Sequence, residues 1–136
     1  MYLISISEGD LRRSVNLLQT ISTFNKSMIS QNLINDICGV IPMNFISDLF
    51  EVARFKQPEF ILKHADEFLC YGYDLKQFNY QITDFIGSNT SITDEEKGKI
   101  NFLILECELN LHENSSQNIQ LYKLLTGIRN LFKMNL

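Results

Sequence analysis

Two adjacent arginines near the N-terminus, Arg12 and Arg13, have the side-chain type best suited to binding an anion. A guanidinium group is always charged and offers several N–H donors in a fixed planar fork, which suits a phosphate or a carboxylate. Adjacent residues on a helix point about 100° apart, so the two arginines cannot make the same contact. Spacing alone favours ordinary solvated arginines, because motifs this short often occur by chance.

Four glutamates in the C-terminal half raise the question of paired catalytic carboxylates. They are Glu95, Glu96, Glu106 and Glu108. Acid–base catalysis needs a carboxylate placed within reach of a substrate proton, and no polar partner or cleft signature accompanies these residues. They are interpreted as solvated helix faces, and Asp10 as a helix cap and dipole partner. We therefore predict no catalytic residue in this chain.

The cysteines and histidines form neither a disulfide framework nor a metal-binding pattern. Cys38, Cys70 and Cys107 are odd in number, far apart and set among apolar residues, which is typical of reduced, buried thiols in an intracellular protein. His64 and His112 stand at no ligand spacing from a cysteine or from each other. We expect no metal site.

Length and charge limit the class of protein. A chain of 136 residues with 45% hydrophobic content can form one domain, or one domain with part of a second. Its net charge of −4 is spread along the chain without a cluster of Lys or Arg, which disfavours direct contact with DNA. No apolar run approaches the roughly 18 residues of a transmembrane helix, and the N-terminus lacks a signal-peptide pattern. We expect a soluble, unsecreted protein with no membrane partner.

Apolar periodicity predicts an all-α fold, because no segment alternates cleanly like a half-buried strand. The first helix is expected to begin at Ser7, as its cap, and to end near Thr23. Its expected apolar stripe is Leu11, Val15 and Leu18, with Leu17 and Ile21 at the margins. A short second helix is expected to follow Ser30 and to stop at Gly39.

Pro42 marks a candidate domain boundary, because a proline pushes the preceding residue away from helical angles. Five helices are expected after it, joined by loops short enough for neighbouring helices to pack together. Pro58 begins the second of them, Gly87 ends the third, and Thr93 with Glu96 forms a capping box for the fourth. The expected inward stripes are Phe45, Ile46, Leu49, Phe50 and Ala53; Ile61, Ala65 and Phe68; Leu75, Phe78, Ile82 and Phe85; Ile100, Leu103, Ile104 and Cys107; and Leu121, Leu125, Ile128 and Phe132.

Six phenylalanines recur through these helices and have two interpretations. They are Phe45, Phe50, Phe60, Phe68, Phe78 and Phe85. On an exposed surface such rings could stack nucleic-acid bases. Their helical spacing favours core packing instead.

A more specific signal lies in residues 6–19, ISEGDLRRSVNLLQ. This segment resembles the sensor-2 helix of the small subunits of replication factor C, the eukaryotic sliding-clamp loader of the AAA+ family, at every fixed position of S-x-G-D-x-R-R-x-x-N-x-L-Q. Residues 34–42, INDICGVIP, resemble the junction between the lid of the ATPase module and the collar in that family. Residues 97–125 are similar to the last two collar helices, although Gln117 and Asn118 stand where relatives usually carry an acidic residue and a histidine.

The resemblance implies that residues 1–39 are the C-terminal part of an AAA+ lid domain and that residues 40–136 are a five-helix collar, the oligomerisation domain. In the family, the first arginine of the motif, here Arg12, reaches the γ-phosphate of ATP bound in the same subunit. Arg13 is interpreted as a surface or domain-interface charge. Asn16 and Gln19 follow Arg12 at steps of four and three and would share one polar face with it.

The resemblance also implies that this chain is a piece of a longer protein and not itself an enzyme. Subunits of this family carry a phosphate-binding loop, an acidic Mg²⁺-binding motif and an arginine-finger motif, and none of these occurs in the sequence. The nearest glycine–lysine combination, residues 97–99, is expected inside a helix and cannot cradle phosphate. We expect no cofactor in this piece, and ATP with Mg²⁺ in the full-length complex.

The function implied is assembly, through the collar, of the pentameric clamp loader that uses ATP to load the sliding clamp onto primed DNA in replication and repair. The implied partners are the other replication factor C subunits, with the clamp and DNA contacted by the whole complex, in the nucleus. Two alternatives stay open. The chain could be the lid and collar of another AAA+ ATPase, or a stand-alone helical adaptor that mediates protein interactions.

Overall fold

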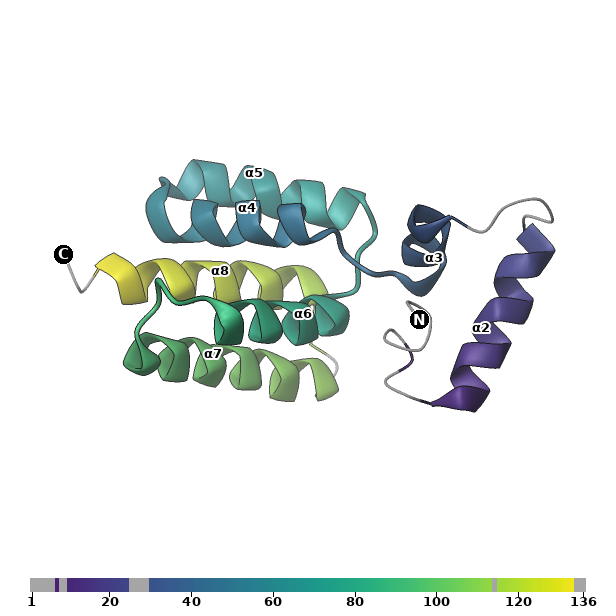
Figure 1. Cartoon of the computed structure of the whole chain (residues 1–136). Helices are drawn as coiled ribbons and strands as arrows, with labels where there is room; N and C mark the ends of the chain where they lie inside the picture. Colours follow the sequence, from purple (N-terminus) through teal and green to yellow (C-terminus); the bar gives the residue numbers. More distant parts are fainter. Residues whose placement is uncertain (1–6, 8–9, 25–29, 114, 134–136) are drawn as a thin grey trace. The chain divides into compact units, whose positions relative to one another are not determined.

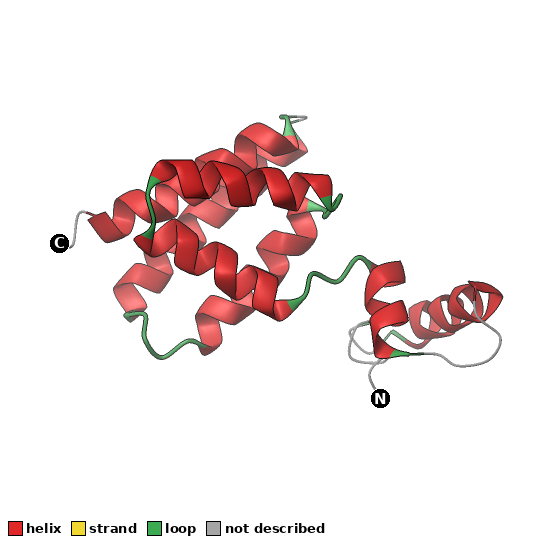
Figure 2. Cartoon of the chain, turned by 90° about the horizontal axis from the view of Figure 1, so that it is seen from above, coloured by secondary structure: helices red, strands yellow, loops and turns green. Residues whose placement is uncertain are grey.

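The computed structural model describes residues 7, 10–24, 30–113 and 115–133, and it confirms the all-α prediction. Every regular element in the described ranges is a helix, as Figure 2 shows in red. The chain divides into two compact units, which we call the N-terminal unit, Met1–Val40, and the C-terminal unit, Ile41–Leu136. The assignment of these units to a lid and a collar stays a prediction at this point.

The N-terminal unit contains helix α2, Leu11–Phe24, and helix α3, Gln31–Cys38. The cap of α2 is Asp10, whose carboxylate accepts the backbone N–H groups of Arg12 at 2.9 Å and Arg13 at 3.1 Å. This confirms the interpretation of Asp10 as a cap and corrects the predicted start at Ser7. The reason is that an anionic acceptor satisfies the free amides and also complements the positive end of the helix dipole.

Helix α3 begins and ends as the sequence predicted. The Ser30 hydroxyl accepts the backbone N–H of Leu33 at 3.2 Å, and Gly39 takes a left-handed φ of +66° immediately after the last helical residue. Glycine adopts this angle without the steric cost that a Cβ atom would add. The two residues therefore set the length of α3 from both ends.

The apolar stripe predicted for α2 does not face inward. Ile21 is fully buried and Leu17 is half-buried, but Leu11, Val15 and Leu18 are 74%, 45% and 44% exposed. The packed residues are instead Ser14, Leu17 and Ile21, and α2 contacts α3 within this unit. A unit of 40 residues buries little surface and covers only one side of this helix.

The C-terminal unit consists of five helices. They are α4 (Met43–Phe55), α5 (Pro58–Cys70), α6 (Leu75–Ser88), α7 (Asp94–His112) and α8 (Gln117–Lys133). Helix α8 contacts α4, α5 and α7, and it runs between the α4–α5 pair and the α6–α7 pair (Figure 1). Helix α8 is therefore the central element of the unit.

The predicted inward stripes of this unit form one hydrophobic core. Most of their residues are buried, while Phe45, Phe85 and Leu103 are half-buried against the core. Among the six phenylalanines, Phe60 is the exception at 51% exposure, because it lies in the first turn of α5, on the side away from the core. The interpretation of Phe60 as a core residue was wrong.

Gly39 and Gly87 were both predicted to end helices, and Gly87 does not. Gly72 has a φ of +72° and reverses the chain between α5 and α6. Gly87 lies inside α6, which continues to Ser88 and is followed by Asn89 in an extended conformation. A glycine ends a helix by taking a left-handed angle. Here the fully buried Ile86 holds the last turn of α6 against the core.

The capping box of α7 is present as predicted. The Thr93 hydroxyl accepts the N–H of Glu96 at 3.3 Å, and the Glu96 carboxylate accepts the N–H of Thr93 at 2.9 Å. We expect Thr93→Ala to lower the free energy of unfolding by about 1 kcal/mol, since the cap bond is lost. Urea denaturation measures this change. Thr90→Ala in the same loop is the control, and an equal loss in both variants would contradict the role of the cap.

Candidate functional site

Arg12 is the second residue of α2, and its side chain is exposed. Its backbone N–H is held by the Asp10 carboxylate, which fixes the position of the first helical turn. Within the described part of the chain, the Arg12 guanidinium makes no ion pair. A guanidinium exposed in this way retains its full set of donors for an anion outside the chain.

The polar face predicted beside Arg12 is present on α2. Arg12, Asn16 and Gln19 are all exposed and follow one another at helical steps. The exposed Leu11 and Val15 border this face, so α2 presents a charged group next to apolar surface. A helix with such a mixed surface is suited to contact with another protein surface as well as with an anion.

Arg13 points about 100° around the helix from Arg12, and its charge acts on Cys38 of α3. Burial raises the pKa of the half-buried Cys38 thiol on α3, and the positive charge of Arg13 acts in the opposite direction. Because burial is the larger cause, the thiol is less acidic than a free cysteine. Cys38 is therefore a packing residue and not an activated nucleophile, and Arg13 fits its prediction as a surface charge.

The four glutamates do not form a catalytic pair. Glu95 pairs with Lys99 at 2.7 Å along α7, Glu106 pairs with Lys123 at 2.7 Å, and Glu96 belongs to the capping box. The ion pairs are solvent-exposed, where such pairs contribute little to stability. Glu95 therefore lies on a solvated helix face as predicted, whereas Glu108 is half-buried and lines a hollow between α6 and α7.

No group of three potential metal-ligating side chains occurs within the described ranges. Cys107 is buried, and its sulfur lies 3.6 Å from the side-chain nitrogen of Asn79. Burial is the main cause that raises the pKa of this thiol. Among the described helices, none is long and apolar enough to cross a membrane.

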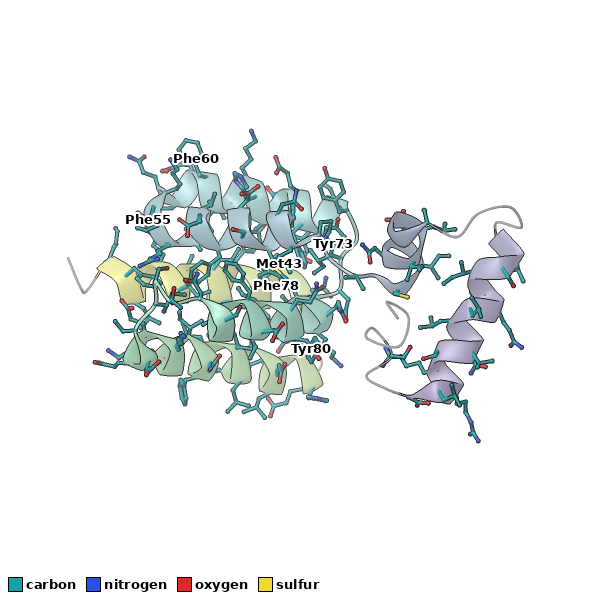
Figure 3. The ribbon with its side chains drawn as sticks, in the orientation of Figure 1. Met43, Phe55, Phe60, Tyr73, Phe78 and Tyr80 are labelled. Carbon is teal, nitrogen blue, oxygen red and sulfur yellow. The ribbon has the colours of Figure 1, made fainter. Side chains whose placement is uncertain are left out.

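Helix α7 carries an exposed apolar face that was not recognised in the sequence. Phe102, Leu105 and Leu109 follow at steps of three and four residues and are 68%, 52% and 58% exposed. Beside them, α6 and α7 enclose a surface hollow of about 530 Å³ whose lining includes Tyr80 and Leu105. Tyr80 is labelled in Figure 3. We call Tyr80, Phe102, Leu105 and Leu109 the α7 face.

A second exposed apolar set lies on α5 and the residue after it, and we call it the α5 edge. It comprises Leu62 and Tyr71, which line one hollow, and Phe60, which lies about 200° around the helix from Leu62. Helices α5 and α7 lie on opposite edges of the C-terminal unit (Figure 1), and Figure 3 shows Phe60 on the outer side of α5. Exposed apolar residues therefore lie on both α5 and α7.

The signal for the α7 face was present in the sequence. Between residues 100 and 109, apolar residues occupy both the inward positions Ile100, Ile104 and Cys107 and the positions of Phe102, Leu105 and Leu109. A helix that is apolar around most of its circumference is buried on more than one side in its final environment.

Gln117 has a structural role at the start of α8. The Gln117 side-chain nitrogen donates to the backbone carbonyl of Tyr73 at 2.9 Å and so ties the start of α8 to the loop before α6. A carboxylate at this position could not donate to a carbonyl.

Comparison with known proteins gives one consistent result. No family model matches the chain. The chain is 31% identical to Replication factor C subunit 4 of Arabidopsis thaliana over 121 residues, which are 88% of this chain and 35% of that protein. It is 25% identical to Replication factor C subunit 2 of Saccharomyces cerevisiae, covering 95% of this chain and 38% of that protein. It is 27% identical to Replication factor C subunit 4 of Homo sapiens, and the match covers 98% of this chain and 37% of that protein.

Proposed function

Since this chain is related to the small subunits of replication factor C, we propose that it is the C-terminal part of such a subunit and serves in clamp-loader assembly. The matches confirm the resemblance predicted from residues 6–19, and they cover 88 to 98% of the chain. The chain spans 35 to 38% of the length of these relatives. This near-complete coverage is the observation that carries the proposal.

The C-terminal unit is proposed to be the collar, through which the chain joins the other subunits of a pentameric complex. A ring of similar subunits placed head to tail needs two different complementary surfaces on each member. The α7 face and the α5 edge, on opposite sides of the unit, supply two such surfaces. Exposed apolar surface of this kind is typical of protein–protein contact.

The N-terminal unit is proposed to be the end of an AAA+ lid, with Arg12 as its nucleotide-sensing residue. ATP and Mg²⁺ would be bound by other parts of the full-length subunit, and Arg12 would contribute a charged donor to the γ-phosphate. An exposed guanidinium at the start of a capped helix fits that role. The complete complex would use ATP to load the sliding clamp onto primed DNA, in the nucleus, for replication and repair.

Two other functions would use the same fold. A stand-alone helical adaptor would need the apolar surfaces but not Arg12, and the lid and collar of a different AAA+ ATPase would need both. The complete motif in residues 6–19 and the matches to replication factor C subunits from a plant, a yeast and a human favour the clamp loader.

The experiment that tests the proposal places Arg12→Ala in the full-length subunit assembled with its partners. We expect ATP turnover stimulated by clamp and DNA to fall about 10- to 100-fold, since one charge-assisted hydrogen bond to phosphate is lost. Steady-state phosphate release measures it. Arg13→Ala is the matched control and should have a much smaller effect.

Equal turnover in the Arg12 variant and the unaltered complex would remove Arg12 from the nucleotide site. A failure of the unaltered full-length subunit to assemble with replication factor C partners would contradict the proposed function as a whole.

A further inference from the structure

A pocket of about 350 Å³ where α4 and α8 end has a strongly basic lining. Its described lining residues are Arg54, Phe55, Lys56, Glu96, Arg129, Phe132 and Lys133. Four of these are cationic and one is a carboxylate, whereas the whole chain has a net charge of −4. Figure 3 labels Phe55 at this end of the C-terminal unit. The charge of the pocket is thus opposite in sign to that of the chain that carries it.

Arg54 is held in this pocket by aromatic rings. Its guanidinium carbon lies 4.5 Å from the centre of the Phe132 ring and 4.8 Å from the centre of the Phe55 ring. Contact with ring faces orients a guanidinium without using its N–H groups. In the described part of the chain, the Arg54 side chain makes no ion pair. Its donors are therefore oriented and available.

The Arg129 side chain is half-buried in this pocket. One of its terminal nitrogens, Nη1, is buried and has no hydrogen-bond partner among the described residues. A buried donor without a partner is costly, and Glu96, the one carboxylate among the described lining residues, is engaged in the capping box of α7. An anion bound in the pocket would offset this cost.

Helix-end electrostatics account for only part of this basic cluster. Arg54 and Lys133 lie in the last turns of α4 and α8, where cations complement the negative end of the helix dipole. Arg129 lies a full turn before the end of α8, so this effect does not explain its position. The helix dipoles therefore account for Arg54 and Lys133 but not for Arg129, whose position is explained if the pocket binds an anionic ligand.

The remaining lining residues distinguish between classes of anion. Glu96 contributes a carboxylate, which repels a doubly charged phosphate more strongly than a singly charged carboxylate. The Phe55 ring is 65% exposed and gives the pocket an apolar wall. Nucleic acid is further disfavoured by the overall negative charge of the chain.

We propose that this pocket binds an acidic peptide segment of a partner protein, with a Glu or Asp carboxylate placed against Arg54 and Arg129 and an adjacent apolar side chain against Phe55. The guanidinium groups supply planar donors that match a carboxylate. This binding site requires neither Arg12 nor ATP, and it does not depend on the proposed function of the chain.

The test is a titration of the isotope-labelled 136-residue chain with the blocked dipeptide N-acetyl-Phe-Glu-amide, followed by NMR at the side-chain Nε–H groups of Arg54 and Arg129. We expect saturable shifts with a dissociation constant in the millimolar range. The dipeptide with Gln in place of Glu should bind at least about fivefold more weakly, because the charge is lost. Inorganic phosphate should also bind more weakly than the Glu dipeptide.

Arg129→Gln is the test variant and Lys63→Gln, on the outer surface of α5, is the control with the same change in charge. We expect the dissociation constant to rise at least about fivefold in the first and to stay unchanged in the second. If Arg129→Gln alters the backbone spectrum, Lys133→Gln replaces it. Equal binding of the Glu and Gln dipeptides, unchanged binding in the pocket variants, or tighter binding of phosphate would each overturn the proposal.

Discussion

Phe68→Ala is expected to lower the free energy of unfolding by about 3–5 kcal/mol, the cost of removing a large buried ring and leaving a cavity. Phe68 is fully buried on α5. The centre of its ring lies 5.3 Å from that of Phe78 in an edge-to-face arrangement and 5.6 Å from that of Tyr73. It therefore joins α5 to α6 and to the loop between them. In urea denaturation followed by circular dichroism, the midpoint should fall while the slope stays nearly constant.

Phe60→Ala is the matched control for this prediction, because it makes the same chemical change on the same helix. Phe60 is half-exposed, and its removal should change the free energy of unfolding by less than about 0.5 kcal/mol. Equal losses in the two variants would contradict the placement of Phe68 in the core and of Phe60 outside it.

The helices of the C-terminal unit could be predicted because their signals are local and agree with one another. Pro58 at the first position of α5, the Thr93–Glu96 box before α7 and the turn at Gly72 each determine a boundary within a few residues of sequence. The apolar stripes between these boundaries repeat at helical spacing, and most of them are buried. Where capping, turn chemistry and periodicity agree, the helices follow from sequence.

The errors arose where a local signal had two solutions and tertiary packing chose between them. Ser7 and Asp10 can both cap a helix, and the carboxylate of Asp10 is the one that does. Helix α2 has apolar residues on two sides, and the small N-terminal unit buries Ile21 while it leaves Leu11 exposed. Gly87 continues a helix because the neighbouring Ile86 is buried.

Of the functional candidates, Arg12 could be predicted from a local motif, whereas the basic pocket could not, because its residues are distant in the sequence. Arg12 was found through its motif, and its exposure on a capped helix was then seen in the structure. The basic pocket brings together Arg54 and Arg129, which are 75 residues apart in the sequence. No local pattern contains that pairing, because it depends on how α4 packs against α8.

Phe102→Glu in the full-length subunit is expected to weaken assembly with the neighbouring replication factor C subunit by about 30-fold to several hundred-fold. This prediction depends on the proposed role of the α7 face as one of the two assembly surfaces. A central aromatic residue of a protein interface typically contributes 2 kcal/mol or more, and a charge placed there adds a desolvation cost. Analytical ultracentrifugation or surface binding of the full-length subunit to its partners measures the dissociation constant.

The change at position 102 should leave the fold of the chain intact, because Phe102 is 68% exposed and lies outside the core. The thermal unfolding midpoint therefore separates loss of the interface from loss of the fold, and Phe102→Tyr, which keeps the ring, should assemble normally. An unchanged dissociation constant for Phe102→Glu would exclude the α7 face from the assembly. In that case the α5 edge, on the opposite side of the unit, would be the next surface to carry the same substitution, at Phe60.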